Sequence, residues 1–461
     1  VHIKEYIRMP NLWILILLFV SYLFSMAANL QYESKKGLVT MVFWVLYFGI
    51  LYAFRDSDSQ ERVRKEFHLM AAVHILYALV MTLISLGMMA VGYSSSYIDK
   101  SNGNYEVCSG FHDGRLWGAF QDPNLGAIVC CTAIALCIYF MGKKKEKLWK
   151  AAFAVCILLF LFYIAFSDSR NGLVSIAAGM AVYAFLRGYY RERRWKKQWI
   201  NLAAAVLVGA VCFFLPEGIK YSYNYAVGQQ IQQQAEQTKT AQNQSSANKS
   251  GSSSSSANKS GSTNKSSGST GSSSGSGKSS ASGKSTTGGT KTPAAPVKRN
   301  YSLEGDISNR RFDLWKSAVE VGLSRPLTGT SFPGIVPYAK ENLPDTYIVN
   351  NDHWDYSTMD NEILNVCVSQ GCPGLLKLAG RVIALIRYVF ARIWKLQKGE
   401  FAAAQVLLTC IVMLSASSMF QATMFYQNST DANMFWMFLG YLVFMLKEIP
   451  AKNSEKVQVQ V

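Results

Sequence analysis

The chain has 461 residues, of which 50% are hydrophobic and only 16% are charged, and its formal net charge is +17. In a soluble protein, such a basic balance would suggest a nucleic-acid partner. Most of this chain, however, consists of apolar runs of about 17–25 residues, which are long enough to cross a bilayer. The composition therefore excludes an ordinary soluble protein. It indicates that the extra lysines and arginines lie in the loops of a membrane protein without a nucleic-acid partner.

Ten apolar runs are candidate membrane spans. No small-residue cleavage site is evident at residues 25–29, so we expect the first run to be a retained helix rather than a signal peptide. The eighth run is the weakest, because Lys377 and Arg381 interrupt it. The predicted spans are residues 11–30, 38–54, 69–93, 124–141, 150–166, 172–188, 199–215, 363–386, 402–422 and 432–447.

Loops rich in lysine and arginine alternate with loops that have few of them. The basic loops are residues 55–68, 142–150 and 187–198 and the segment that follows the eighth span. The positive-inside rule puts these loops, and both chain termini, in the cytoplasm. Arg170 and the long loop 216–362 would then face outward together.

The nine cysteines indicate no disulfide framework. Eight of them lie in or beside apolar runs, where a thiol is most simply a small packing residue. Cys108 is alone in an outer loop, and no spacing of cysteine and histidine resembles a zinc site. The sequence therefore predicts no metal site.

The outer loop 216–362 begins with a Ser/Gly/Lys-rich tract. Residues 232–296 are nearly free of large apolar side chains, and one octapeptide occurs at 245–252 and again at 255–262. Such a tract cannot bury enough surface to offset its ordering entropy, so we predict a disordered insert or spacer. The alternative is a specific contact with an anionic wall polymer.

The rest of this loop has the character of a folded segment. Phe312, Trp315, Val319 and Gly322 follow helical spacing, which predicts an amphipathic helix at or near the membrane surface. Residues 324–330 then read as a helix stop and turn. An acidic group leads into the eighth span: Asp352, His353, Asp355, Asp360 and Glu362.

Two arginine positions stand out, because charges at a membrane boundary are costly and tend to be functional. Arg170 lies in a six-residue break between two apolar runs, and Arg310 and Arg311 lie in the outer loop. Guanidinium groups from two places near one membrane face suggest a site for a phosphorylated or carboxylated group.

Four segments share a pattern with one known family. Residues 118–124 end in Pro-Asn at the start of a span, and residues 167–172 contain Ser-x-Ser-Arg. Residues 311–315 form Arg-x-x-x-Trp before a Pro-x-x-Gly turn, and residues 360–364 read Asp-Asn-Glu-Ile-Leu with a Gly ten residues after the Asn. In order, spacing and outward side, this set resembles the O-antigen ligase and O-antigen polymerase superfamily of bacterial membrane glycosyltransferases.

The expected fold is an all-α integral membrane protein, similar to the GT-C class, with about ten transmembrane helices and one large extracytoplasmic loop. Its expected parts are an N-terminal region of about seven helices at 1–215, the loop 216–362 with the insert 232–296, three helices at 363–447, and a cytoplasmic tail at 448–461. The resemblance places it in the bacterial cytoplasmic membrane.

The resemblance implies glycan transfer outside the membrane from a polyprenyl (undecaprenyl) diphosphate carrier to a hydroxyl of another lipid-linked glycan. Asp360 stands where ligase-like members have His, which favours a polymerase that acts en bloc with inversion. His353 could supply the imidazole that is missing there. The alternatives are a ligase to a final acceptor and, from another class, a transporter or flippase of lipid-linked sugars.

The resemblance also implies the site residues. The candidate catalytic residues are Arg170 and Arg311, which would neutralise the diphosphate, and Asp360, which would act as base ahead of Glu362 and Asp355. The residues expected to bind substrate are Asn171, Arg310, Asn361, Asn124 and Arg115. A diphosphate is a good leaving group, so no metal and no cofactor are expected.

Each assignment has a purely structural alternative. Arg170 could cap the helix break or reach lipid headgroups, Arg311 could anchor a surface helix, and Asp360 could be the N-cap of the eighth helix. Asp168 could serve only as the ion-pair partner of Arg170. The expected partners are the lipid-linked oligosaccharide and membrane lipid, together with the flippase and chain-length regulator proteins that a polymerase would work with.

Overall fold

The computed structural model describes residues 9–32, 35–54, 57–99, 105–249, 295–298, 308, 310–351 and 356–447. The chain forms two compact units, one made of Val1–Tyr223 with Pro296–Val461 and the other of Asn224–Ala295. The hydrophobic core and all of the candidate site residues belong to the first unit.

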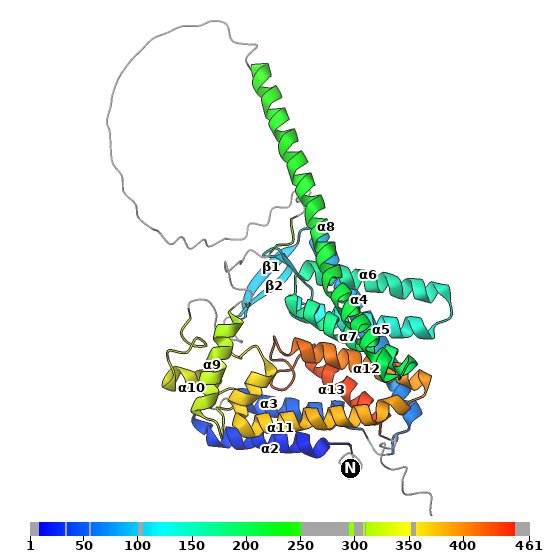
Figure 1. The fold of residues 1–461 in the computed structure, drawn as a ribbon. Coiled ribbons are helices and arrows are strands. Elements are labelled where there is room, and N and C mark those ends of the chain that lie inside the picture. The colour runs from blue at the N-terminus through cyan, green and yellow to red at the C-terminus, as the bar shows by residue number, and fades with distance from the viewer. Residues whose placement is uncertain are drawn as a thin grey trace, which may run out of the picture. The chain divides into compact units, whose positions relative to one another are not determined.

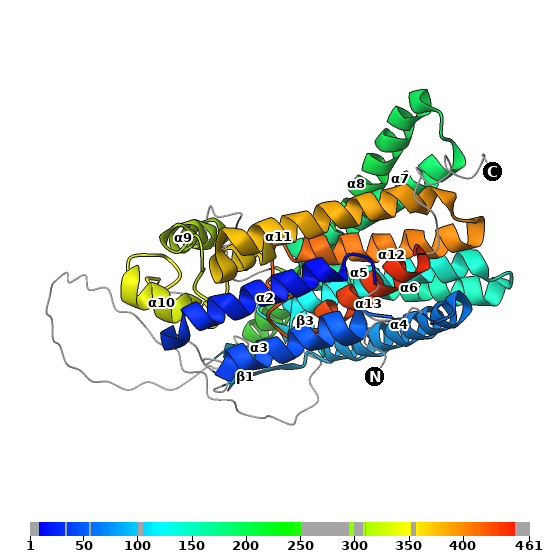
Figure 2. The same ribbon diagram turned by 90° about the horizontal axis from the view of Figure 1, so that it is seen from below.

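The first unit is built mainly of helices, several of which run side by side (Figures 1 and 2). In the described residues, a helical element overlaps each of the ten predicted spans. These elements are α2 (Leu12–Ala28), α3 (Lys35–Val45) with the π-helical η2 (Leu46–Leu51), α4 (Gln60–Ala90), α5 (Pro123–Lys143), α6 (Lys147–Ser167), α7 (Arg170–Arg191), α8 (Trp195–Lys249), α11 (Glu362–Arg392), α12 (Lys398–Ser417) and α13 (Thr430–Met445).

Six of these helices are long and apolar enough to cross a membrane: α4, α5, α6, α7, α12 and the part of α8 from Lys196 to Gln233. The prediction of a multi-pass helical membrane protein is therefore confirmed. The number of spans and the sidedness of the loops remain predictions.

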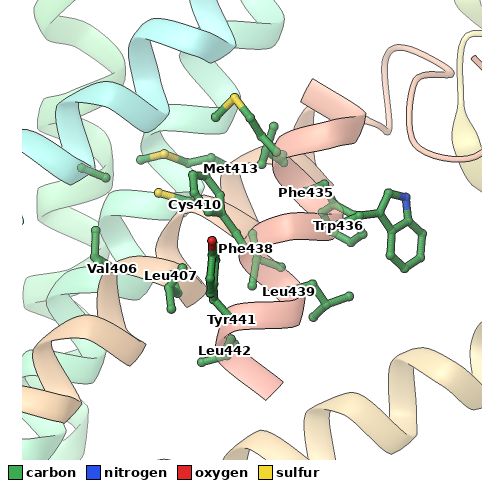
Figure 3. Packing of buried hydrophobic residues seen from close by; sticks show 14 of the residues in the cluster. Val406, Leu407, Cys410, Met413, Phe435, Trp436, Phe438, Leu439, Tyr441 and Leu442 are labelled. Atoms are coloured by element: carbon green, nitrogen blue, oxygen red, sulfur yellow. The ribbon is translucent and has the colours of Figure 1, made fainter. Parts of the chain in front are cut away.

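Helix α5 lies at the centre of the packing, where it contacts α4, α6, α7, α12 and α13. Small residues allow this close approach: a Cβ added at Gly126 would lie 2.2 Å from the hydroxyl of Tyr163 on α6. Figure 3 shows Leu407 and Cys410 of α12 beside Phe438 of α13. The thiols predicted to be packing residues include four that are fully buried: Cys130, Cys131, Cys137 and Cys410.

Helix α8 does not stop at residue 215, where the predicted span ends. It continues through Pro216 to Lys249, so its last residues overlap the start of the predicted insert 232–296. Most of the rest of that insert, residues 250–294, lies outside the described residues, and so does the predicted tail 448–461.

A small antiparallel sheet, which the sequence did not predict, accompanies the mainly helical fold. It consists of β1 (Ser94–Asp99), β2 (Tyr105–His112) and β3 (Arg115–Gly118), in the order β1-β2-β3. Asp113 and Gly114 both have positive φ and form the two-residue turn between β2 and β3, which is the geometry that an Asp-Gly pair favours. We did not anticipate the sheet, because its strands are short and lie between two much stronger apolar runs.

The helix predicted from residue 311 onward is present as α9 (Arg311–Ser324), and it packs against α11 near one end of that helix (Figure 2). The face that α9 buries carries Leu314, Ala318 and Val321, and of the predicted stripe only Gly322 is buried with them. Of that stripe, Phe312 is 67% exposed and Val319 is 53% exposed. A short helix, α10 (Ile335–Asn342), adds Ile335 and Tyr338 to the same small core.

Candidate active site

Several helix ends meet at one place in the first unit. The connection 418–429 between α12 and α13 bonds to the first residues of α11 and of α7, and to the residue that caps α5. Each of these three helices starts with a polar N-cap side chain that accepts a backbone N–H: Asp122 for α5, Ser169 for α7 and Asn361 for α11. The three sequence motifs that contain these caps are therefore brought together.

These three helix starts share an unusual backbone conformation. The residue before each cap has a positive φ, which is 60° at Gln121, 48° at Asp168 and 47° at Asp360. A side chain in this region costs roughly 1–3 kcal/mol, and such residues cluster at functional sites. The local strain therefore supports a function for this end of the bundle.

Asp360 and Arg311 form the electrostatic centre of the site. Burial raises the pKa of the Asp360 carboxyl, the charge of Arg311 lowers it in part, and the charge of Asp122 raises it, with a net result above the usual value. The Asp360 carboxylate also accepts a hydrogen bond of 3.1 Å from the hydroxyl of Thr358. The structure thus brings the predicted base within electrostatic range of a predicted cation from another element, α9. The N-cap of α11 is Asn361, so the alternative role of Asp360 as that cap is wrong.

A hydrogen-bonded chain links α7 to α5 beside this pair. The amide of Asn171 donates to the Ser417 hydroxyl at 2.8 Å and to Gln421 Oε1 at 3.0 Å. Gln421 in turn donates to the Asp122 carboxylate at 3.2 Å. The charge of Asp122 also raises the pKa of Asp360. This hydrogen-bonded network therefore connects the start of α7, which carries Arg170 and Asn171, to the carboxyl group at the start of α11.

Three of the predicted binding residues hold loops in place. Asn124 accepts a hydrogen bond of 2.8 Å from Ser169, and Asn361 donates one of 3.1 Å to the carbonyl of Met419. Arg115 Nε donates to the carbonyl of Ser167 at 2.9 Å. These contacts position the two loops that precede α7 and α13, so they give these residues a structural role whatever else they bind.

The remaining predicted residues have different surroundings. Arg170 is exposed at the first position of α7, next to the polar chain. Arg310 lies 3.6 Å from the carboxylate of Asp313 in its own helix. The carboxylate of Glu362 is buried and accepts the backbone N–H groups of Met424 and Phe425, which makes it a structural residue rather than a free base. His353 and Asp355 lie outside the described residues.

Three residues of this region, Asp122, Gln421 and Lys220, were not predicted from the sequence. Asp122 carries the expected signal of a helix start, an Asp followed by Pro at the beginning of an apolar run, but only the Asn of that motif was assigned to substrate binding. Gln421 and Lys220 have no local signal. Lys220 of α8 forms an ion pair with the carboxylate of Asp168 at 2.8 Å. The sequence had suggested only Arg170 as the partner of Asp168.

An apolar cleft lies beside the turn that carries Arg170. It has a volume of about 820 Å³ and is lined by α6 and α8 through Phe162, Phe166, Phe214, Ile219 and Tyr223, among others. The pair of Asp168 and Lys220 joins the same two helix segments.

Residues 155–379 match the family model described as O-antigen ligase, and this range contains Arg170, Arg311 and Asp360. No curated protein matches the chain.

Proposed function

We propose that this chain, which belongs to the O-antigen ligase and polymerase superfamily, joins lipid-linked oligosaccharide repeat units on the outer face of the cytoplasmic membrane. The family supports a glycosyltransferase-like role in surface polysaccharide synthesis with a lipid-linked oligosaccharide substrate. The polymerase reaction, the diphosphate carrier and the outer face are our proposals.

The observation that carries the proposal is that Asp360, at the start of α11, lies within electrostatic range of Arg311, near the starts of α5 and α7. In the proposed reaction the acceptor hydroxyl gives its proton to the Asp360 carboxylate while its oxygen bonds to the anomeric carbon of the donor. The bond from that carbon to the diphosphate breaks, and its electron pair leaves with the polyprenyl diphosphate. A raised pKa suits this task, because a more basic carboxylate takes the proton more readily.

The developing charge on the diphosphate needs fixed cations and dipoles. Arg311 and Arg170 would provide guanidinium groups, which bind phosphate in a bidentate way and stay charged. The starts of α5, α7 and α11 would add their positive dipole ends. The apolar cleft between α6 and α8 supports a donor with a long hydrocarbon tail.

Two other functions remain as alternatives. A ligase would use the same chemistry on a different acceptor, and only the Asp at position 360 in place of His favours the polymerase. A transporter is expected to hold its charged groups near the bilayer midplane. Here the charged and polar candidates gather at helix ends. The buried Arg381 of α11 donates hydrogen bonds to Tyr52 and to the carbonyl of Asn11, the residue before the first residue of α2.

The test is the size profile of carrier-linked and surface glycan in a strain that lacks this chain, complemented with wild type, Arg170→Ala or Asp360→Asn. Single repeat units stalled on the carrier, with long chains restored only by wild type, would support the polymerase. Long chains that stay on the carrier would support the ligase instead. Full rescue by both variants would overturn the proposed site and favour transport.

A further inference from the structure

A cluster of potential metal ligands lies on strand β2, outside the site described above. A carboxylate oxygen of Glu106, the Sγ of Cys108 and a ring nitrogen of His112 all lie within 4.8 Å of one another. The even spacing of these residues puts their side chains on one face of the strand. Three donors of three chemical types therefore converge. The next residue, Asp113, has its carboxylate 3.5 Å from His112 Nε2.

The thiol of Cys108 is the second observation that points to a ligand. Its side chain is 3% exposed, and within the described part of the chain its sulfur makes no hydrogen bond. The sulfur has a carboxylate oxygen of Glu106 and a ring nitrogen of His112 within 4.8 Å, so a cation placed among the three groups could bind all of them.

The imidazole of His112 is held from the other side. Its Nδ1 lies 3.1 Å from the hydroxyl of Ser94 on β1, which leaves Nε2 directed at Asp113. Ligating histidines are commonly oriented in this way by a bond to the ring nitrogen that does not bind the metal.

We propose that Glu106, Cys108 and His112 bind one Zn²⁺ ion, with the Asp113 carboxylate turning toward the ion as the fourth ligand. Zinc accepts thiolate, imidazole and carboxylate ligands at about 2.0–2.3 Å, so neighbouring donor atoms around a tetrahedral ion lie roughly 3.4–3.7 Å apart. The present separations reach this range through side-chain movements of about an ångström. Binding converts the Cys108 thiol to a thiolate and releases its proton to solvent.

The position of the site suggests what the ion does. His112 pairs in register with Arg115 across the turn between β2 and β3, and Arg115 holds the carbonyl of Ser167 in the loop that precedes Arg170. An ion at the end of this hairpin would fix Arg115 and, through it, that loop. The metal is structural in this proposal, and it does not depend on whether the chain is a polymerase.

The experiment uses the full-length protein in detergent, loaded with Zn²⁺ or with Co²⁺ as a spectroscopic probe. Wild type is expected to retain one ion per chain, to show a thiolate-to-cobalt charge-transfer band, and to gain thermal stability from zinc. Cys108→Ser and His112→Asn should lose all three, whereas Cys372→Ser, which removes an exposed thiol elsewhere, should keep them. Ser94→Ala should weaken zinc binding about 10–100-fold, because it removes the group that orients the ligand.

Two results would overturn the zinc site: the same zinc content in Cys108→Ser as in wild type, or a cobalt complex without the thiolate band. Glu106→Gln separates loss of zinc binding from loss of folding, because this side chain is exposed and can change without disturbing the strand. Its metal-free melting temperature should equal that of wild type, while its zinc affinity falls. Unchanged affinity in this variant would count against Glu106 and against the four-ligand site.

Discussion

At the scale of single residues, the structure separates groups that a sequence motif treats alike. Asp360 and Glu362 are two residues apart, but the buried carboxylate of Glu362 accepts two backbone N–H groups, whereas the partly buried carboxylate of Asp360 lies within electrostatic range of Arg311. The second arrangement leaves a basic carboxylate near a cation, which suits proton transfer. The sequence could offer both as candidates, but it could not rank them by their partners.

Asp360→Asn is expected to abolish most of the transfer activity while leaving the protein folded. Loss of a general base costs about 10²–10⁴-fold in rate. The fold should tolerate the change, because burial of an ionised Asp360 is unfavourable and the amide removes that charge. Transfer rates with purified lipid-linked substrate, measured beside melting temperatures, would check this. Asp313→Asn, which alters the carboxylate that pairs with Arg310 on α9, is the control and should keep near wild-type rates.

The pH dependence of wild type should report the same carboxyl group. A base must be ionised, and the pKa of Asp360 is raised, so activity is expected to fall as the pH drops through a value above the usual range of an aspartate. In the residual activity of Asp360→Asn this acidic limb should be missing. A limb of the same position in both proteins would assign it to another group.

Arg311→Lys tests whether the fork of the guanidinium matters or only its charge. A lysine keeps the charge but loses bidentate binding, so we expect an intermediate loss, with Arg311→Ala falling further, by about 10²–10³-fold. Steady-state rates should show the drop in kcat rather than in melting temperature. Arg62→Lys, in an exposed ion pair with Glu66, is the matched control and should change neither quantity. Equal rates for Arg311→Lys and wild type would mean that Arg311 acts only through its positive charge and not through bidentate binding.

At the scale of elements, the sequence predicted the positions of the helices well and the contacts between them poorly. Long apolar runs and polar caps are local signals, and each of the ten predicted spans overlaps a helix. The contacts of Gln421 with Asp122 and Asn171 join residues that are about 250–300 positions apart, and nothing in the local pattern specifies them. The sheet was missed for another reason, since a short hairpin with an Asp-Gly turn has little periodicity to detect.

Close packing of α5 against α6 should depend on Gly126. In Gly126→Ala the new methyl group would meet the buried Tyr163 ring, whose hydroxyl donates to the carbonyl of Trp117. Overpacking of this kind costs about 1–3 kcal/mol, and the apparent melting temperature in detergent should fall. Gly142→Ala in the same helix has open space around the new methyl group and should be neutral or stabilising. Equal melting temperatures for the two variants would mean that α6 can move away at little cost.

At the scale of the whole molecule, the arrangement of helices separates the candidate site from the basic loops. The site is built from the starts of α5, α7 and α11 and the end of α12, and the connections at the other ends of α5 and α7 are the basic loops of the sequence. The positive-inside rule then makes the site end extracytoplasmic. The orientation follows from the charges of the loops, because the arrangement of the helices does not by itself distinguish the cytoplasmic from the extracytoplasmic side.

Cysteine labelling in intact cells tests that orientation. Asn428→Cys, in the exposed connection between α12 and α13, should react with a membrane-impermeant thiol reagent, because it lies at the site end of the bundle. Lys145→Cys, in the exposed loop between α5 and α6, should react only after the membrane is opened. Both variants are made in a Cys372→Ser background, which removes the exposed native thiol. The reverse pattern would put the Arg311–Asp360 pair on the cytoplasmic side, where an extracytoplasmic polymerase could not use it, and the proposed function would have to be abandoned together with the topology.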